Sequence, residues 1–481
     1  MEHKQKVGLN ISVRTFIGAV ALLLILMLAA GILTQVVPQG SFQRVVVDGR
    51  EQVVAGSYAQ LSGAAKLPVW RWLTAPFEVL LSGDSTIAIG IMVFLTLIGG
   101  TFYILDKSGV LRYIMSSVIK RYASQKYRML AVMIFIFMLL GSTVGIFEET
   151  ITLVPIAVAI AFSMGWDSLV GLGISAFAVA MGFGAGTFNP FTVGVAQNLA
   201  EVPMFSGVWL RAAIFALSYV VLVLFISRYA RRIEADPARS ITRKTDELYR
   251  DRYASGVDES ALSNTHLRLA TRIFVAFILV VFAYIVLGFF IKPLADYTLI
   301  VMAVMFAAAG LVCGAIAQYG KTLGRDFLKG MLSVLPAVLL ILLAMSVKQI
   351  ISAGGIMDTI LYSLSGSLAG ASSYGAALLI FLIVLVFNGF IGSGSAKAFL
   401  LIPLIAPLAD LSGVTRQTMI LAFVLGDGFS NMIYPTNAAL LIMLGLTGTS
   451  WGKWFRWTWK MQLIMLIMSV AALCLAVGIG Y

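Results

Sequence analysis

The sequence is poor in the residues from which metal centres and acid–base active sites are built. Its 481 residues include two histidines and two cysteines, and charged residues make up 12% of the chain. Soluble proteins carry about 25% charged residues. Cys313 and Cys474 lie within apolar runs, whereas His3 and His266 lie in polar segments. We therefore expect no disulfide framework, no metal site, no cofactor and no enzyme activity.

Apolar runs dominate instead, and hydrophobic residues make up 60% of the chain. Runs of roughly 20 residues recur, each enough to cross a hydrocarbon core about 30 Å thick. This pattern predicts an all-α polytopic membrane protein. The net charge of +12 is concentrated in a few loops, which indicates cytoplasmic loops and contact with anionic lipid rather than nucleic acid. The run from Phe16 to Val37 is too long for a signal-peptide core, so we expect an uncleaved first span.

The basic residues Lys4, Lys6 and Arg14 predict a cytoplasmic N-terminus. Spans are expected near 15–37, 85–105, 273–291, 294–318, 332–352 and 458–478. The segment 38–84 should be external, with an interfacial helix in "LPVWRWLTAPFEVLL", and 106–128 should be an amphipathic arm on the inner surface. The one long hydrophilic segment, 228–272, is expected to be a cytoplasmic linker between a first half (1–227) and a second half (273–481).

The stretch "GFGAGTFNPFTVGVAQNLA" (182–200) places glycine, threonine, asparagine and proline between long apolar runs. Unsatisfied backbone groups at membrane depth cost several kcal/mol each, so non-helical backbone survives there only inside protein or against a water-filled cavity. We therefore predict that residues 186–192 form a mid-membrane break in a helix. Thr187, Asn189 and Thr192 are expected to line a cavity.

The interruptions of the first half recur in the second half in the same order. A shift of 248 residues places Gly141 on Gly389, Pro155 on Pro403, Gly165 on Gly413 and Asn189 on Asn437. Counting spans from a cytoplasmic N-terminus puts the arm 106–128 inside and its counterpart, 353–373, outside. The repeats are therefore expected to be inverted, which is the architecture of secondary transporters with a site near the midplane.

The motifs "FGAGTFNPFTVGVAQNLAEVPMFSG" and "GSGSAKAFLLIPLIAPLADLSGVTRQTMILAFVLGDGFSNMIYPTNA" resemble the signatures of the YfcC/DcuC-type family, the anaerobic four-carbon-dicarboxylate carriers of the ion transporter superfamily. The resemblance covers essentially the full chain. It implies two re-entrant hairpins, two broken helices, a homodimer, elevator-type alternating access and the inner membrane of a prokaryotic cell. Substrates in and near this group include dicarboxylates, short-chain fatty acids and exchanged arginine and ornithine.

Carried over by position, the resemblance places hairpin 1 near 138–163 and hairpin 2 near 386–411. It places the broken helices near 170–200 and 418–447. The hairpin tips are then Gly145–Thr150 and Gly392–Lys397, and the breaks are Gly186–Thr192 and Tyr434–Ala438. Dicarboxylate/sodium members of the superfamily tend to carry Ser-Asn-Thr type signatures at these points. The tips "IFEET" and "GSGSAK" depart from that pattern.

Four charged residues lie in otherwise apolar stretches, where an acidic residue at the bilayer centre costs on the order of 2.5–3.5 kcal/mol. Glu148 and Glu149 are candidates for a cation site, a proton carrier, a clamp on a substrate amine, or a solvated tip. Adjacent helical residues point about 100° apart, so one of the two is expected to face the site. Lys397 is a candidate to bind a carboxylate, to pair with a glutamate across the pseudo-twofold axis, or to reach the surface.

Asp427 is a candidate functional carboxylate or a cap for the break that follows it, and Asn431 shares its helical face. Ser393, Gly394 and Ser395 of the second tip, with Thr436 and Asn437 of the second break, are candidates to bind a carboxylate or sodium ion. Alternatively, these groups satisfy the broken backbone locally.

The sequence thus predicts a secondary active transporter of a small carboxylate, coupled to Na⁺ or H⁺. The alternative is an amino-acid antiporter in which a hairpin glutamate binds a cationic substrate. A passive channel is disfavoured because paired breaks with inverted symmetry are typical of alternating access.

Overall fold

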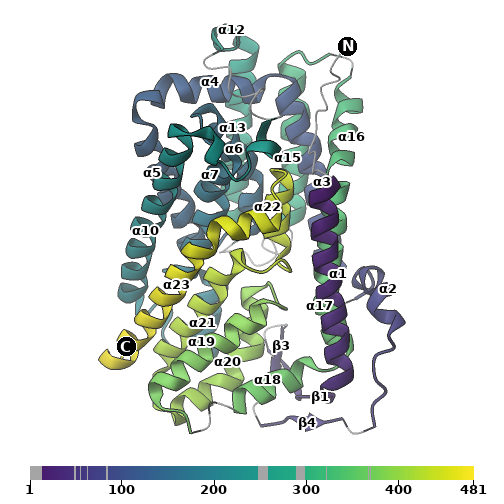
Figure 1. The fold of residues 1–481 in the computed structure, drawn as a ribbon, viewed down its shortest axis with the longest axis vertical. Helices are drawn as coiled ribbons and strands as arrows, with labels where there is room; N and C mark the ends of the chain where they lie inside the picture. Colours follow the sequence, from purple (N-terminus) through teal and green to yellow (C-terminus); the bar gives the residue numbers. More distant parts are fainter. Residues whose placement is uncertain are drawn as a thin grey trace.

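The chain folds almost entirely into helices. The computed structural model describes residues 13–47, 50–54, 56–61, 63–82, 85–247, 258–288, 298–320, 322–366, 368 and 370–481. His3, Lys4 and Lys6, and with them the predicted orientation of the N-terminus, lie outside the described residues. The helices fall into two groups according to which elements pack together (Figure 1).

The first group is a scaffold. It contains α1 (Val13–Val36), α3 (Ser85–Lys107), α13 (Thr265–Gly288), α15 (Thr298–Ile316), α16 (Leu323–Ser333) and α17 (Leu335–Ala353). Helix α3 packs on α15 and α16, and α1 packs on α17. A Cβ atom on Gly330 would lie 2.7 Å from the carbonyl oxygen of Gly99 and 2.8 Å from the Cα atom of Gly100. Glycine therefore allows close backbone approach between α3 and α16, which is the packing role common for small residues in membrane helices.

The second group contains the predicted hairpins and breaks. Its first half contains α5 (Lys126–Leu139), α6 (Val154–Ser163), α7 (Ser168–Leu172), α8 (Ala178–Ala185), α9 (Val195–Leu199) and α10 (Val208–Ala235). Its second half contains α19 (Ser373–Asn388), α20 (Gly394–Leu411), α21 (Arg416–Gly428), α22 (Ala438–Leu446) and α23 (Trp451–Ile479). Helix α7 begins at Ser168 and α21 begins at Arg416, 248 residues later. The same separation holds for Asn189 and Asn437, which precede the helical segments after the two breaks.

Each half contains a helical hairpin whose two ends lie side by side. The ring of Tyr127 at the start of α5 is 5.8 Å from that of Trp166, which follows α6. In the second half, the hydroxyl of Ser373 at the start of α19 donates to the carbonyl of Ser412 after α20, at 2.9 Å. In Figure 1, α5, α6 and α7 lie in the upper half, whereas α19 and α20 lie in the lower half. The two hairpins thus enter the molecule from opposite ends.

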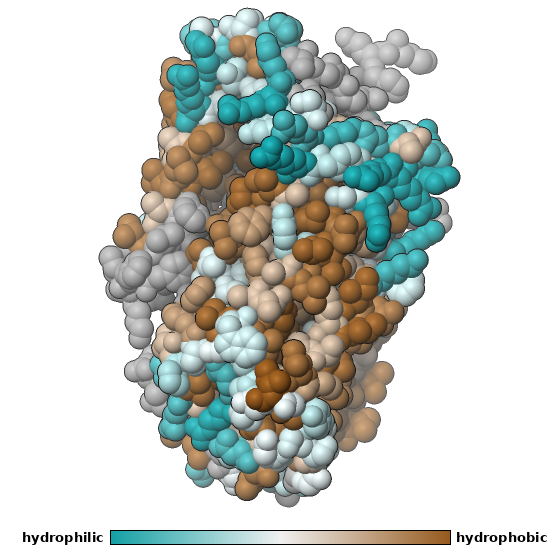
Figure 2. All heavy atoms as spheres, turned by 90° about the vertical axis from the view of Figure 1, so that its left-hand side faces the viewer, coloured by the Kyte–Doolittle hydropathy of each residue, from teal (hydrophilic) through white to brown (hydrophobic). Residues whose placement is uncertain are grey.

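The surface carries an apolar belt between two hydrophilic ends (Figure 2). Among the described residues, seven helices are long and apolar enough to cross a membrane. They are Ala88–Lys107, Lys126–Val144, Ser168–Ala185, Val208–Ala235, Leu323–Ala353, Gly394–Leu411 and Trp451–Ile479. Shorter apolar helices accompany them, among them Val20–Val36 and Ser373–Asn388. The prediction of a polytopic helical membrane protein is therefore confirmed.

Three amphipathic helices and four short strands accompany these groups. Helix α4 (Val110–Tyr122) and its counterpart α18 (Met357–Gly366) follow α3 and α17, and α2 (Trp70–Val79) forms where an interfacial helix is predicted. Strands β1 (Gly40–Ser41) and β4 (Ala59–Gln60) pair antiparallel, as do β2 (Arg44–Val47) and β3 (Arg50–Val53). The guanidinium of Arg44 bonds the Asp358 carboxylate at 2.8 Å and so attaches this segment to α18.

The aromatic stretch "WGKWFRWTWK" forms the first part of α23, which therefore begins seven residues before the predicted span 458–478. Trp454 and Trp457 are buried, and the Trp454 ring lies 5.5 Å from that of Phe177. The indole N–H groups of Trp451 and Trp454 donate to the carbonyls of Ile433 and Met432, both at 2.9 Å. Indole N–H groups seek partners when buried, and here they satisfy backbone freed by the second break.

The segment predicted as a plain linker is partly built into the core. Helix α10 extends to Ala235, and the following residues Ser240, Thr242 and Asp246 are buried. The Asp246 carboxylate accepts bonds from the backbone N–H and hydroxyl of Ser168, both at 3.1 Å, and from the Thr242 hydroxyl at 2.6 Å. The linker is therefore fastened to the start of α7.

Attachment of this linker segment should weaken as pH rises. Burial raises the pKa of Asp246 from 3.8 to about 6, an effect that the nearby Asp167 reinforces and that the hydroxyls of Thr242 and Ser168 oppose. A raised pKa contributes stability that is complete below pH 3.8 and is lost as pH rises through about 6. The largest contribution is about 3 kcal/mol, because one pKa unit is worth about 1.4 kcal/mol.

We therefore expect residues 240–247 to exchange amide hydrogens more slowly at pH 5 than at pH 7.5, after correction for intrinsic exchange rates. Asp246→Asn should abolish this difference, whereas Glu247→Gln, at an exposed side chain, should preserve it. Equal protection at both pH values in the unmodified protein would contradict the prediction.

Candidate functional site

Both broken helices resume after an asparagine cap, and in the first half the cap follows a glycine that ends the preceding helix. Helix α8 ends at Gly186, whose φ of 48° is in the left-handed region that favours glycine. The side chain of Asn189 then accepts bonds from the N–H groups of Phe191 and Thr192, at 2.9 and 3.3 Å, and starts a helical turn at Pro190–Gly194. In the second half, Asn437 caps α22 by accepting from the Leu440 N–H at 3.0 Å.

The two broken helices come into direct backbone contact at a pair of glycines. Helix α8 packs on α21, and a Cβ atom on Gly428 would overlap the Cα and N atoms of Gly184. A Cβ atom on Gly184 would lie 2.5 Å from the ring of Phe429. The site therefore forms where the two halves come closest.

Gly428→Ala should prevent this contact and with it the assembly of the two halves. Forcing a methyl group into a packed interior costs about 1–3 kcal/mol when side chains can adjust, and at Gly428 the neighbouring atoms are backbone. We expect a strong loss of monodisperse protein in size-exclusion chromatography. Gly452→Ala is the matched control, because nothing lies within 4 Å of a Cβ atom there.

Each break is tied by a threonine to its own hairpin, three residues before the tip. The Thr187 hydroxyl bonds the Ser142 hydroxyl at 2.9 Å, and the Thr187 N–H donates to the same Ser142 oxygen at 3.0 Å. The Thr436 hydroxyl donates to the Gly389 carbonyl at 2.6 Å. Thr187 and Thr436, proposed from the sequence as site residues, are thus used to satisfy and join broken backbone.

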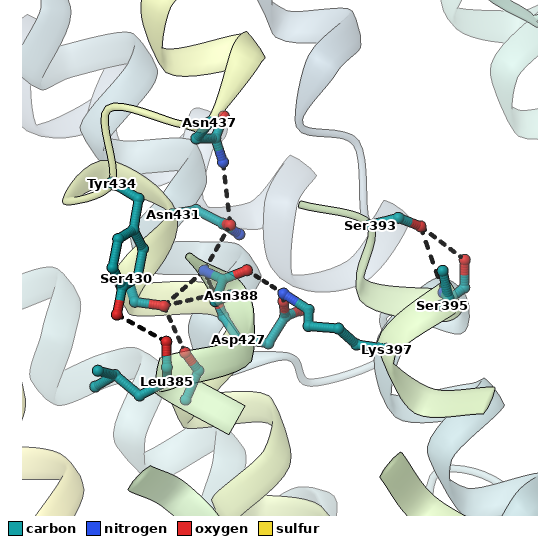
Figure 3. Close-up of polar contacts among 12 residues, drawn as sticks. Leu385, Asn388, Ser393, Ser395, Lys397, Asp427, Ser430, Asn431, Tyr434 and Asn437 are labelled. Atoms are coloured by element: carbon teal, nitrogen blue, oxygen red, sulfur yellow. Dashed lines mark hydrogen bonds and ion pairs between the residues drawn. The ribbon is translucent and has the colours of Figure 1, made fainter. Parts of the chain in front are cut away.

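An ion pair is buried next to the second break (Figure 3). The Lys397 ammonium lies 2.5 Å from Oδ1 of Asp427, and the two side chains are 0% and 1% exposed. The ammonium also donates to the side-chain oxygen of Asn388. The expectation that Lys397 could reach the surface is therefore wrong, because its length lets it turn inward to a carboxylate of its own half.

Asn388 holds the second half of the site together, and sequence reasoning missed it. Its Nδ2 atom donates to the Asp427 carbonyl at 3.0 Å, to the Ser430 hydroxyl at 2.6 Å and to Oδ1 of Asn431 at 3.0 Å. Asn431 in turn accepts from Nδ2 of Asn437 at 3.2 Å. The signal was present as a single amide in the apolar run "LIVLVFNGF".

Glu148 brings a second carboxylate to this centre from the first hairpin. Its side chain is exposed, although Ile146, Phe147 and Thr150 around it are buried. Its charge interacts with those of Asp427 and Lys397. Glu148 therefore faces an accessible space beside the ion pair. Glu149 belongs to the helical turn Glu148–Leu153, but its side chain lies outside the described part of the structure.

Several buried polar atoms at the meeting point of the halves have no hydrogen-bond partner. They are Nδ2 of Asn189, Oγ1 of Thr192 and Oδ2 of Asp427, whereas Oδ1 of Asp427 is bound by the Lys397 ammonium. A Cβ atom on Gly394 would lie 2.5 Å from Thr192 and 2.8 Å from Oδ2 of Asp427, so these three residues are neighbours. Buried polar atoms are normally paired, and unpaired ones mark a place for a ligand.

The remaining predicted residues shape the second tip. The Ser393 side chain caps α20 by accepting from the Ala396 N–H at 3.4 Å, and it lies 3.4 Å from the Ser395 hydroxyl. Both serines point away from the Lys397–Asp427 pair in Figure 3. Within the described residues, no three histidine, cysteine, aspartate or glutamate side chains come together as a metal site would require.

Sequence comparison places the chain among carriers. The family described as C4-dicarboxylate anaerobic carrier (DcuC) matches residues 18–478. An Escherichia coli K12 protein named "Putative basic amino acid antiporter YfcC" is 29% identical over 412 residues, which cover 84% of this chain and 81% of that protein. An uncharacterised Haemophilus influenzae protein is 26% identical over 397 residues, covering 82% and 76%.

Two solved transporter structures resemble the fold. The YdaH transporter of Alcanivorax borkumensis aligns with a TM-score of 0.41 and 17% identity, covering 97% of this chain and 98% of that one. MtrF of Neisseria gonorrhoeae, described with a class of antimetabolite efflux pumps, aligns with a TM-score of 0.42 and 19% identity, covering 95% and 94%. From the match over residues 18–478, the chain belongs to the C4-dicarboxylate anaerobic carrier family and is a membrane transporter of small molecules, a class distinct from enzymes.

Proposed function

We propose that this protein exchanges amino acids across the membrane, with preference for those that carry a second amine. One observation carries the proposal: the centre between the two halves combines an excess of carboxylates with unpaired hydrogen-bond donors. Glu148 and Asp427 supply two carboxyl groups, and Lys397 supplies one amine. The alternative from the sequence is therefore preferred over the favoured dicarboxylate reading.

Charge balance supports an amine-bearing substrate. A dicarboxylate would bring two negative charges to a centre in which carboxyl groups already outnumber amines. Like charges in a low-dielectric interior repel strongly, and Lys397 is already held by Asp427 and Asn388. A substrate ammonium group placed near Glu148 would instead neutralise the surplus.

The unpaired donors support a carboxylate at the other end of the same substrate. Nδ2 of Asn189 and Oγ1 of Thr192 have no partner and can both donate to a carboxylate. A molecule with one carboxylate and one or two amines, such as arginine, ornithine or lysine, matches both sets of groups.

We further propose that exchange requires no sodium ion. The Lys397 ammonium occupies the side of Asp427 on which a coupling cation would bind, at 2.5 Å. Because the Lys397 ammonium already pairs with Asp427, a sodium ion is not needed at this position. The remaining site groups, Gly394, Asn431 and Asn437, are proposed to shape the substrate cavity through the second tip and break.

The transport cycle is proposed to be an elevator movement of the hairpin-containing group against the scaffold, in a homodimer with a cytoplasmic N-terminus. Inverted repeats are supported by the hairpins that enter from opposite ends and by helices that recur 248 residues apart. Inverted repeats with broken helices are typical of alternating access about a midplane site. The basic residues near α4 support placement of that end in the cytoplasm of a prokaryotic cell.

Exchange in proteoliposomes tests the proposal. Vesicles loaded with unlabelled arginine should take up labelled arginine without a sodium gradient, and Glu148→Gln should reduce that uptake at least about tenfold, because a charged hydrogen bond is worth about 1.5–3 kcal/mol. Glu201→Gln, at a glutamate paired with Arg416 on the surface, is the matched control. Uptake of succinate but not arginine would overturn the amino-acid proposal, and a strict sodium requirement would overturn the role given to Lys397.

A further inference from the structure

An open surface pocket with a mixed polar and apolar lining lies beside the loop that follows α9. Its volume is about 530 Å³, within the range of small-molecule sites. It is lined by Val202, Ser206, Gly207, Trp209, Gln417, Ile479, Gly480 and Tyr481. The walls therefore come from the first residues of α10 and α21 and the last residues of α23, so both halves of the protein contribute.

A buried guanidinium lies directly behind this cavity. The Arg211 side chain is 0% exposed and donates to the Ser206 carbonyl at 3.0 Å and to the Tyr481 hydroxyl at 3.2 Å. Both of these residues line the cavity. A third and longer bond, of 3.5 Å, reaches the Thr187 carbonyl in the first break.

The charge of Arg211 has no carboxylate partner among the described residues, and its Nε atom is buried with no hydrogen-bond partner. The nearest acidic side chain along the loop, Glu201, is exposed and pairs with Arg416 instead. A buried cation compensated only by carbonyl and hydroxyl dipoles is costly. An anion placed in the adjoining cavity would supply the missing counter-charge.

The cavity wall can also recognise an oxyanion directly. The amide of Gln417 and the hydroxyl of Ser206 face each other at 3.3 Å, and Gln197 reaches Gln417 at 3.4 Å. Such long bonds are weak and can be exchanged for shorter bonds to a ligand. Trp209 and Tyr481 pack edge to face at 5.6 Å and provide an apolar wall.

We infer that this cavity is a second binding site, distinct from the central one, for a small oxyanion whose charge is balanced by Arg211. The group bound is the carboxylate of a soluble molecule or the phosphate of a lipid headgroup. Because Arg211 bonds both the cavity wall and the first break, an anion bound there is connected to the central site through one side chain. The inference is independent of the central substrate and of exchange.

Binding is tested with succinate and with glutamate at constant ionic strength, on full-length protein in nanodiscs of zwitterionic lipid. Trp209 fluorescence should change saturably, and Trp209→Phe should abolish the change. Gln417→Glu, which adds a negative charge to the wall without touching Arg211, should weaken binding at least tenfold, and Gln417→Ala should weaken it less. Asp427→Asn should stop exchange but leave this binding intact.

Two results would overturn the inference: a fluorescence change that survives Trp209→Phe, or binding that is unaffected by Gln417→Glu. Nanodiscs containing phosphatidylglycerol identify the source of the anion. Competition of that lipid with succinate, relieved by Gln417→Glu, assigns the site to a headgroup phosphate. Unchanged succinate affinity assigns it to a soluble carboxylate. Absence of arginine exchange by the unmodified protein, with intact succinate binding, would count against the central proposal alone.

Discussion

Lys397→Met is expected to destabilise the protein and to abolish transport. The substitution keeps most of the side-chain volume but leaves the Asp427 carboxylate buried without a counter-ion. Breaking a buried ion pair by removing one partner costs about 3–5 kcal/mol. Asn388 would also lose its donor at the side-chain oxygen. Thermal unfolding in detergent should show a large fall in the midpoint, and exchange should fall to background.

A double substitution separates the effect on stability from the effect on transport. Lys397→Met combined with Asp427→Asn removes both charges, and replacing a whole buried pair with neutral groups is often neutral for stability. The double variant should therefore unfold nearly as late as the unmodified protein but remain inactive. Lys453→Met is the control, because Lys453 contacts the linker rather than the ion pair. This variant should neither lower the unfolding midpoint nor stop exchange. An active double variant would show that the pair has only a structural role.

Thr192→Val is expected to inhibit transport without loss of stability. The Thr192 hydroxyl is buried and has no hydrogen-bond partner, so its replacement by a methyl group of similar shape removes no bond within the protein. If the hydroxyl binds substrate, its loss costs about 1.5–3 kcal/mol for a bond to a charged group. This corresponds to a rise in KM of about 10- to 150-fold, measured as concentration-dependent exchange.

Thr187→Val is the matched control because Thr187 lies in the same break but bonds Ser142 through its hydroxyl. That variant should lose stability, with an effect on transport no larger than its loss of folded protein. Thr192→Val should thus impair transport without loss of stability, whereas Thr187→Val should mainly lower stability. A destabilised Thr192→Val with an unchanged KM would remove Thr192 from the substrate site.

Much of the fold could be predicted because the helix breaks are determined by residues close together in the sequence. Gly186 and Asn189 are an end signal and a cap whatever surrounds them, and their position between apolar runs indicated depth in the membrane. The shift of 248 residues placed Asn437 in the second break, and the structure adds that Asn437 caps the helix that follows. Apolar run length likewise predicted the spans.

The partners of the polar groups could not be predicted in the same way. Lys397 could have reached a surface, a glutamate or a substrate, and only the packing of α19 against α20 and α21 sets Asp427 and Asn388 beside it. Arg211 went unnoticed because one arginine near the end of an apolar run is ordinary for a membrane anchor. Its inward direction depends on the loop carbonyl of Ser206, which no spacing rule reveals.

The glycine crossing of α8 and α21 separates the geometry of the protein from its chemistry. Gly184 and Gly428 meet main chain to main chain, so the contact makes no demand on the polarity of any neighbour. Side chains around it, including Thr192 and Glu148, can be exchanged during evolution while the two halves keep their register. The same backbone framework can therefore carry different side chains at the site, and with them bind substrates of either charge.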